Sequence, residues 1–159
     1  MTEITRGDSQ AKPKRRHVVC AATELPAGER RIVEVGRRSI GVFNIAGTFH
    51  AIANVCPHQR APLCKGTLAK TAYADKPDEW KWDEDSCVIR CPWHGWEFDI
   101  RSGRSVFNPH RLGVRSYEVA IESQAGGGIG LRTISADEPD PEVKTFDVAV
   151  EEQVVVLYI

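Results

Sequence analysis

Residues 91–99 read CPWHGWEFD, a stretch in which a cysteine and a histidine three positions apart are followed directly by a glycine. Residues 56–58 read CPH, which gives a second pair with 32 residues between it and the first. Thiolate and imidazole are preferred ligands of zinc and of iron-sulfur clusters. The two pairs therefore predict a metal site formed by Cys56, His58, Cys91 and His94.

The composition of each pair bears on the kind of metal site. Structural zinc sites usually take like ligands in pairs, whereas each pair here joins one cysteine to one histidine. A two-iron cluster can use mixed pairs if each segment gives its cysteine to one iron and its histidine to the other. Neutral imidazoles also make an oxidised cluster less negative than four thiolates would, which raises its potential. A zinc-stabilised binding module is the alternative from another class.

Short runs in which β-branched and aromatic residues alternate predict an all-β chain. These runs are RIVEV (31–35), SIGVFNI (39–45), FHAIANV (49–55), CVIR (87–90), WEFDI (96–100), VRSYEVAIE (114–122), VKTFDVAV (143–150) and VVVLYI (154–159). Their length and turn spacing favour an antiparallel sandwich or partly open barrel. Ala46-Gly47 reads as a tight hairpin turn. Both ligand pairs then lie at strand ends, in two metal-binding loops at about 54–66 and 88–110.

Length, charge and cysteine content narrow the class of protein. The 159 residues predict a single domain over 17–159, and a net charge of −1 argues against nucleic-acid binding. The polar residues 1–16, which include KPKRR at 12–16, predict a disordered tail. We expect no membrane span and a cytoplasmic protein, because no apolar stretch approaches about 18 residues. Cys20, Cys64 and Cys87 have no ligand-like neighbour and are expected to be small side chains that are buried or partly buried.

Two further segments have a less regular pattern. Residues 67–86 separate the ligand pairs and contain Trp80 and Trp82. We interpret them as a solvated insertion that flanks the metal site, with partner docking as the alternative. Val114–Ile121 and Val143–Val150 match in chemical type at each of eight positions, on either side of an extra segment at 123–142. Either could be the strand that closes the sheet.

CPHQRAPLCKG and CPWHGWEFDIRSGR together resemble the two-loop motif of the Rieske [2Fe-2S] family. The resemblance implies one [2Fe-2S] cluster, with Cys56 and Cys91 on one iron and His58 and His94 on the other. It implies that the histidine edges lie near solvent, where the electron enters and leaves. It also places Gly95 where the backbone passes close to a cluster sulfide, and Pro109 where a proline packs over the cluster. His110 is expected to be a surface residue.

The resemblance is closest to the low-potential branch of the family, which comprises ferredoxins and Rieske domains of aromatic-ring-hydroxylating oxygenases. Trp93 and Trp96 stand where quinol-oxidising members have a disulfide cysteine and a serine. Fewer hydrogen bonds to the cluster then predict a potential near the low end of about −150 to +300 mV. The implied function is to carry single electrons between a reductase and a terminal oxygenase.

Catalysis by this chain alone is not expected. The oxygenases of this family need a second iron site held by two histidines and a carboxylate in a large catalytic domain. Outside the two pairs the chain has only His17, His50 and His110. The alternative within the family is a Rieske-like small subunit of a larger oxidoreductase such as a nitrite reductase.

Overall fold

The computed structural model describes residues 12–83, 86–125 and 151–159, and it confirms the all-β prediction. Two single-turn 3-10 helices, η1 (Ala22–Glu24) and η2 (Leu63–Lys65), interrupt the strands. The strands in chain order are β1 (Arg16–Ala21), β2 (Arg30–Val35), β3 (Arg38–Ile45), β4 (Thr48–Ala53), β5 (Thr67–Ala69), β6 (Ala72–Lys76), β7 (Glu79–Trp82), β8 (Val88–Arg90), β9 (Glu97–Asp99), β10 (Ser116–Ala125) and β11 (Glu151–Tyr158).

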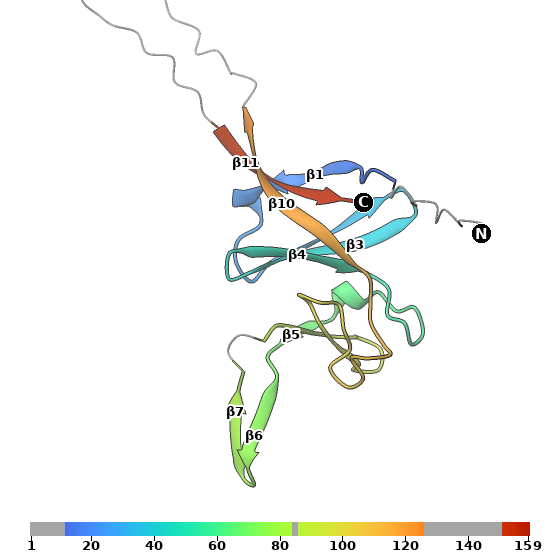
Figure 1. Cartoon of the computed structure of the whole chain (residues 1–159), viewed down its shortest axis with the longest axis vertical. Helices are drawn as coiled ribbons and strands as arrows, with labels where there is room; N and C mark the ends of the chain where they lie inside the picture. The colour runs from blue at the N-terminus through green and yellow to red at the C-terminus, as the bar shows by residue number, and fades with distance from the viewer. Residues whose placement is uncertain (1–11, 84–85, 126–150) are drawn as a thin grey trace, which may run out of the picture.

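Six strands form one antiparallel sheet in the order β1-β11-β10-β4-β3-β2, which curls into a partly open barrel (Figure 1). A smaller antiparallel sheet, β5-β8-β9, lies beneath the barrel and carries the predicted metal-binding loops at its end. Strands β6 and β7 form a separate two-stranded hairpin. The predicted arrangement of a barrel and a two-loop subdomain is therefore confirmed.

Strand β3 explains how the two parts pack together, because it is buried on both faces. Ile40 and Val42 point into the core of the barrel, whereas Phe43 packs in a second core that it shares with the smaller sheet. Adjacent residues of a strand point to opposite faces, so one strand serves both cores. The second core includes Phe98 and Ile100 from the chain that follows the second ligand pair.

The turn between β3 and β4 directs the chain toward Cys56. Ala46 and Gly47 have φ values of 51° and 89°, as a two-residue hairpin turn with a right-handed strand twist requires. At the far end of β4, the buried Asn54 accepts a hydrogen bond from the Cys64 backbone N–H at 2.6 Å. This bond ties η2 to the barrel and so fixes the two ends of the first metal-binding loop.

The predicted N-terminal tail ends earlier than residue 16, and this boundary is corrected. Arg16 begins β1, which pairs with β11, and Arg15 exchanges backbone hydrogen bonds of 2.6 and 3.0 Å with Ile159. Lys14 forms an ion pair with Glu118 at 2.8 Å. The run HVVCA (17–21) therefore belongs to a strand that the sequence pattern did not reveal. Residues 1–11 lie outside the described residues.

The insertion at 67–86 is largely exposed to solvent, as predicted, but its described residues form strands and not a loop, which corrects a second prediction. Its first residues form β5 of the smaller sheet, and the hairpin β6–β7 follows. The hairpin leaves the sheet where Ala69 pairs with Val88, whereas Cys91 follows the opposite end of β8. The hairpin therefore projects from the end of the smaller sheet that is opposite to the ligand loops (Figure 1). The prediction that this segment flanks the metal site is wrong.

Of the two near-repeats, residues 116–121 of the first lie in β10, between β11 and β4. The second, Val143–Val150, lies outside the described residues, as does most of the segment 123–142. Within the part of the chain that the structure describes, no helix is long and apolar enough to cross a membrane.

Candidate metal centre

The two predicted metal-binding loops have the same backbone design. The N–H of Cys56 donates to the carbonyl of Ala61 at 2.9 Å, and the Arg60 N–H donates to the carbonyl of Cys56 at 2.9 Å. In the second loop, the Cys91 N–H donates to Trp96 at 2.7 Å, and Gly95 donates to Cys91 at 3.0 Å. The partners are four and five residues after the cysteine in both loops. Each cysteine thus begins a closed six-residue loop.

The fifth position of each loop has positive φ, 60° at Arg60 and 72° at Gly95. A glycine adopts this conformation without strain, whereas an arginine has to bear the contact between its Cβ and the backbone. A Cβ built on Gly95 would meet no protein atom within 4 Å. Within the protein itself, the positive φ is therefore the feature that favours glycine at position 95. The expected close approach of the Gly95 backbone to a cluster sulfide stays a prediction.

The four predicted ligand residues come together as two like pairs. The side chains of Cys56 and Cys91 are buried, with 1% and 3% exposure, and the two thiols lie close enough to perturb each other. Burial, and then the neighbouring Cys91 thiol, raise the pKa of Cys56. His58 and His94 are exposed, and their ring centroids lie 4.7 Å apart at an angle of 77°. The thiols thus face inward together and the imidazoles face outward together.

Trp96 connects the two loops. It belongs to the second loop, yet its indole stacks on the imidazole of His58 in the first loop, with centroids 4.4 Å apart and planes 6° from parallel. Trp93 approaches His94 edge-on at 6.4 Å. Stacked rings exclude water from one face of the imidazole and restrict its rotation. Trp96 therefore fixes the His58 ring in the orientation that faces His94.

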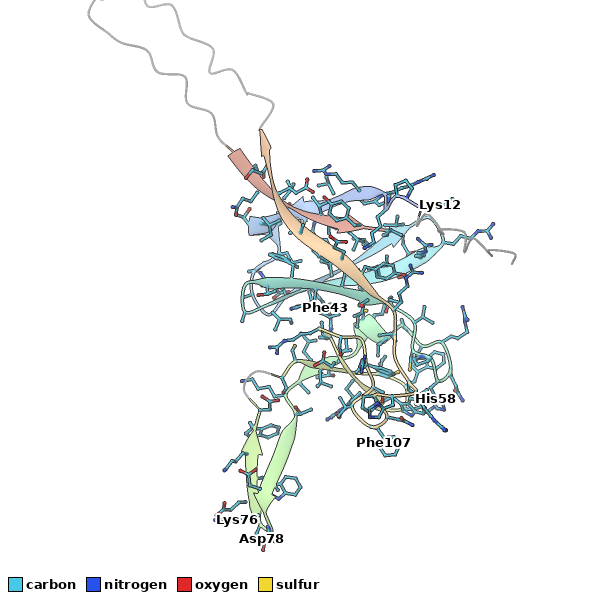
Figure 2. The ribbon with its side chains drawn as sticks, in the orientation of Figure 1. Lys12, Phe43, His58, Lys76, Asp78 and Phe107 are labelled. Carbon is cyan, nitrogen blue, oxygen red and sulfur yellow. The ribbon has the colours of Figure 1, made fainter. Side chains whose placement is uncertain are left out.

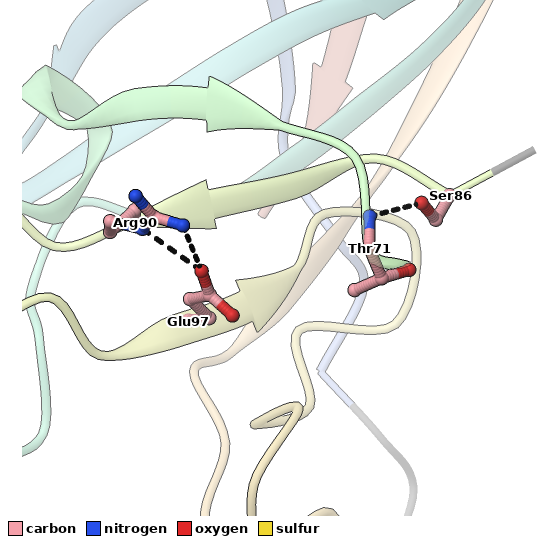
Figure 3. A network of polar contacts seen from close by, with 4 residues as sticks. All are labelled: Thr71, Ser86, Arg90 and Glu97. Atoms are coloured by element: carbon pink, nitrogen blue, oxygen red, sulfur yellow. Dashed lines mark hydrogen bonds and ion pairs between the residues drawn. The ribbon is translucent and has the colours of Figure 1, made fainter. Parts of the chain in front are cut away.

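The base of the second loop is held by an ion pair across strands β8 and β9. Arg90 and Glu97, which are paired in register immediately before and after the loop, form hydrogen bonds of 2.9 and 2.7 Å (Figure 3). Figure 3 also shows the Thr71 N–H donating to Ser86 Oγ at 2.7 Å, which closes the base of the β6–β7 hairpin. The ligand loop and the hairpin are thus fastened at opposite ends of one small sheet.

The remaining predicted residues lie at the surface or in the core. Pro109 and His110 are exposed in the turn that the N–H of Leu112 closes on Asn108 at 3.0 Å. The surface position that was expected for His110 is confirmed, whereas packing of Pro109 over the cluster stays a prediction.

The three cysteines outside the ligand pairs are buried or half-buried, as expected. Cys20 and Cys64 are buried, Cys87 is half-buried, and all three are free thiols. Burial raises the pKa of Cys64 to about 12.

Sequence reasoning missed one prominent residue at this end of the molecule. Phe107 is 94% exposed and lies at the same end as His58 (Figure 2). A hollow of about 680 Å³ runs between it and the second ligand loop, with Trp96 and Val106 in its wall. The phenylalanine in SVFNP was the available signal, but only the fold shows that its ring stands in solvent beside the histidines.

Comparison with known proteins identifies the class. A profile of the Rieske [2Fe-2S] domain matches residues 15–118. The chain therefore belongs to the Rieske [2Fe-2S] domain family, and it carries one Rieske-type [2Fe-2S] cluster.

Relatives and solved structures fall into several kinds of protein. Apoptosis-inducing factor 3 of Mus musculus is 32% identical over 67% of this chain, but the match spans only 15% of that protein. The ferredoxin component of the alkene monooxygenase system of Xanthobacter autotrophicus is 29% identical, over 78% of this chain and 83% of that protein.

Among solved structures, the ferredoxin of carbazole 1,9a-dioxygenase from Nocardioides aromaticivorans IC177 is 26% identical with a TM-score of 0.53. That match covers 67% of this chain and 89% of the ferredoxin. A nitrite reductase small subunit from Mycobacterium tuberculosis shares the fold at 17% identity and a TM-score of 0.53, over 89% of this chain and 95% of that chain.

The contact between Trp96 and His58 gives a prediction. Trp96→Ala should accelerate loss of the cluster to a chelator about tenfold, because residues that orient metal ligands typically contribute 10–100-fold to metal affinity. Trp96→Phe keeps an aromatic ring on the imidazole and should remain close to the unmodified protein. The decay of visible absorbance in excess EDTA measures the rate. Equal rates in all three proteins would show that the stacking does not hold the ligand.

Proposed function

We propose that this chain is a Rieske-type ferredoxin that carries single electrons between a reductase and a terminal oxygenase. The observation that carries the proposal is the arrangement of two buried thiols behind two exposed imidazoles on loops of matching backbone design. An electron carrier needs its redox centre enclosed enough to be stable and close enough to the surface for a partner to reach. This arrangement meets both needs.

The residues present fit a [2Fe-2S] cluster. Cys56 and Cys91 would hold one iron, and His58 and His94 would hold the other, because the structure brings the thiols together and the imidazoles together. When bound, the cluster supplies one-electron redox chemistry. The chain's own residues determine where the exchange takes place, since the histidines alone of the four side chains are exposed.

The surface around the histidines suits a transient protein contact. Trp93 is 58% exposed and Phe107 is 94% exposed, and both belong to the loops at this end of the molecule. Exposed apolar side chains that gather beside a functional group are typical of docking surfaces. We infer that the partner covers the histidine edges and these two aromatic rings together, which would exclude water from the path of the electron.

Relatives support this role for the chain. The alkene monooxygenase component and the carbazole dioxygenase protein described above are both ferredoxins. Five free cysteines fit a reducing compartment, and we propose that the protein acts in the cytoplasm. Catalysis would belong to the oxygenase, because dioxygen chemistry in this family needs a second iron site held by two histidines and a carboxylate in a large catalytic domain.

The test is a redox titration of anaerobically purified protein followed by electron paramagnetic resonance. We expect a Rieske-type signal with a potential near the low end of the family's range of about −150 to +300 mV. The signal should reappear after one cycle of oxidation and reduction. A potential near the upper end would contradict the ferredoxin assignment. Purified protein that contains zinc and no acid-labile sulfide would instead support a zinc-stabilised binding module.

A role as small subunit of a larger oxidoreductase is the second candidate, because the nitrite reductase small subunit shares the fold over 89% of this chain. A subunit stays bound to its large partner through purification, whereas a shuttle makes small, transient contacts. Purification from the native source distinguishes the two. Recovery of the chain by itself supports the ferredoxin.

A further inference from the structure

A cleft of about 860 Å³ lies on the barrel where β1 begins and β11 ends, and no residue of the two ligand loops lines it. Four segments that are distant in sequence meet there, and three of them contribute cationic side chains. Six of these line the cleft, which we call the basic cleft: Lys12, Lys14, Arg15, Arg37, Arg38 and Arg115.

The charge of the basic cleft is largely uncompensated. Among the described residues, no acidic side chain lines it, and Lys14 alone of the six forms an ion pair, with Glu118 at 2.8 Å. The guanidinium of Arg115 lies over the ring of Tyr117, 5.4 Å from its centre. A concave surface with charges of one sign concentrates the electric field and attracts ligands of opposite charge. The cleft therefore favours an anionic ligand.

The apolar residues that line the cleft narrow the kind of anion that it can bind. These are the half-buried Val35 and Ile159 and the exposed Pro13, and the stems of the long cationic side chains add further apolar surface. A compact phosphate is held by donors that converge on one point. Here the exposed cations surround a space of about 860 Å³ that apolar residues also line. This arrangement suits an extended chain with alternating acidic and apolar side chains.

We propose that the basic cleft binds an extended acidic segment of a partner protein. Carboxylates of that segment contact Arg37, Arg38 and Arg115, and its apolar side chains lie on Val35 and Ile159. The inference goes beyond the proposed electron transfer, because the binding needs no cluster.

The position of the cleft gives the binding a further consequence. The Arg115 carbonyl accepts a hydrogen bond from the Ala53 N–H at 2.8 Å, at the end of β4 where the chain enters the first ligand loop. A partner held in the cleft is therefore tethered beside the base of the loop that carries His58.

The test uses the full-length holoprotein and an N-acetylated octapeptide in which glutamate and leucine alternate. Isothermal titration should detect binding that weakens as salt rises, because screening reduces contacts between exposed charges. The double variant Arg37→Gln/Arg38→Gln should bind about tenfold more weakly. The matched control Arg101→Gln/Arg104→Gln removes the same charge from exposed residues outside the cleft and should bind as the unmodified protein does.

Several outcomes would overturn the proposal. Equal weakening by both double variants would show attraction to overall charge and no site. Equal affinity for a peptide of alternating glutamate and serine would show that the apolar residues of the cleft do not contribute to binding. Displacement of the peptide by micromolar inorganic tripolyphosphate would assign the cleft to a phosphate ligand, and concentration-dependent dimerisation blocked by the peptide would assign it to a second copy of the chain. Peptide-induced amide shifts confined to residues 12–17, 35–38 and 115 would support the proposal.

Discussion

Cys91→Ser and His94→Ala are each expected to abolish the visible absorption of the [2Fe-2S] cluster. Each removes one of two like side chains that the structure brings together, and neither a serine hydroxyl nor an alanine methyl replaces a thiolate or imidazole ligand to iron. The absorbance spectrum together with iron and sulfide content per chain measures the loss. An intact two-iron spectrum in either variant would disprove the ligand assignment.

The chain provides a matched control for the cysteine variant. Cys87 is half-buried, has no ligand-like neighbour in the sequence and lies four residues before Cys91. Cys87→Ser should therefore retain the full cluster content. If this variant also lost its cluster, the effect of Cys91→Ser would have to be ascribed to damage to the smaller sheet rather than to the loss of a ligand.

Gly66→Ala should strongly destabilise the fold, with a loss of about 3 kcal/mol or more in the free energy of unfolding. A Cβ on Gly66 would overlap the backbone carbonyl of Arg90, the residue directly before Cys91. The atoms nearest to this Cβ are all backbone atoms, of Arg90 and Leu63, so no flexible side chain can move aside to relieve the overlap. Because Gly66 closes η2 at the end of the first metal-binding loop, the overlap would also push the two loops apart. Urea unfolding followed by circular dichroism measures the change.

Gly28→Ala is the matched control for this prediction. Gly28 has a φ of 88°, but a Cβ there would meet no atom within 4 Å. Its expected cost is about 1–2 kcal/mol, the strain of positive φ alone. If Gly66→Ala cost no more than Gly28→Ala, the close approach of Gly66 to Arg90 would not be a feature of the protein in solution.

The strand pattern and the ligand pairs were readable from the sequence because they depend on local spacing. The runs SIGVFNI and FHAIANV predicted β3 and β4 since alternation reports which side chains are buried in a strand. The hairpin β6–β7 was missed because its strands are exposed on both faces, so they have no buried side to produce such an alternation. Trp80 and Trp82 alternate along β7 as strand residues do, but their side chains are 76% and 65% exposed, and acidic neighbours made the segment look like a loop.

The amino-acid sequence by itself determined the chemistry of the site, because cysteine and histidine in two mixed pairs limit which metal centre can form. It also determined the all-β class through the two-residue period of its strands. Tertiary structure alone decided which groups meet. The stacking of Trp96 on His58 and the meeting of Lys12, Arg37 and Arg115 join residues from separate segments. Such contacts follow from strand register and packing of the two cores, which no local pattern encodes.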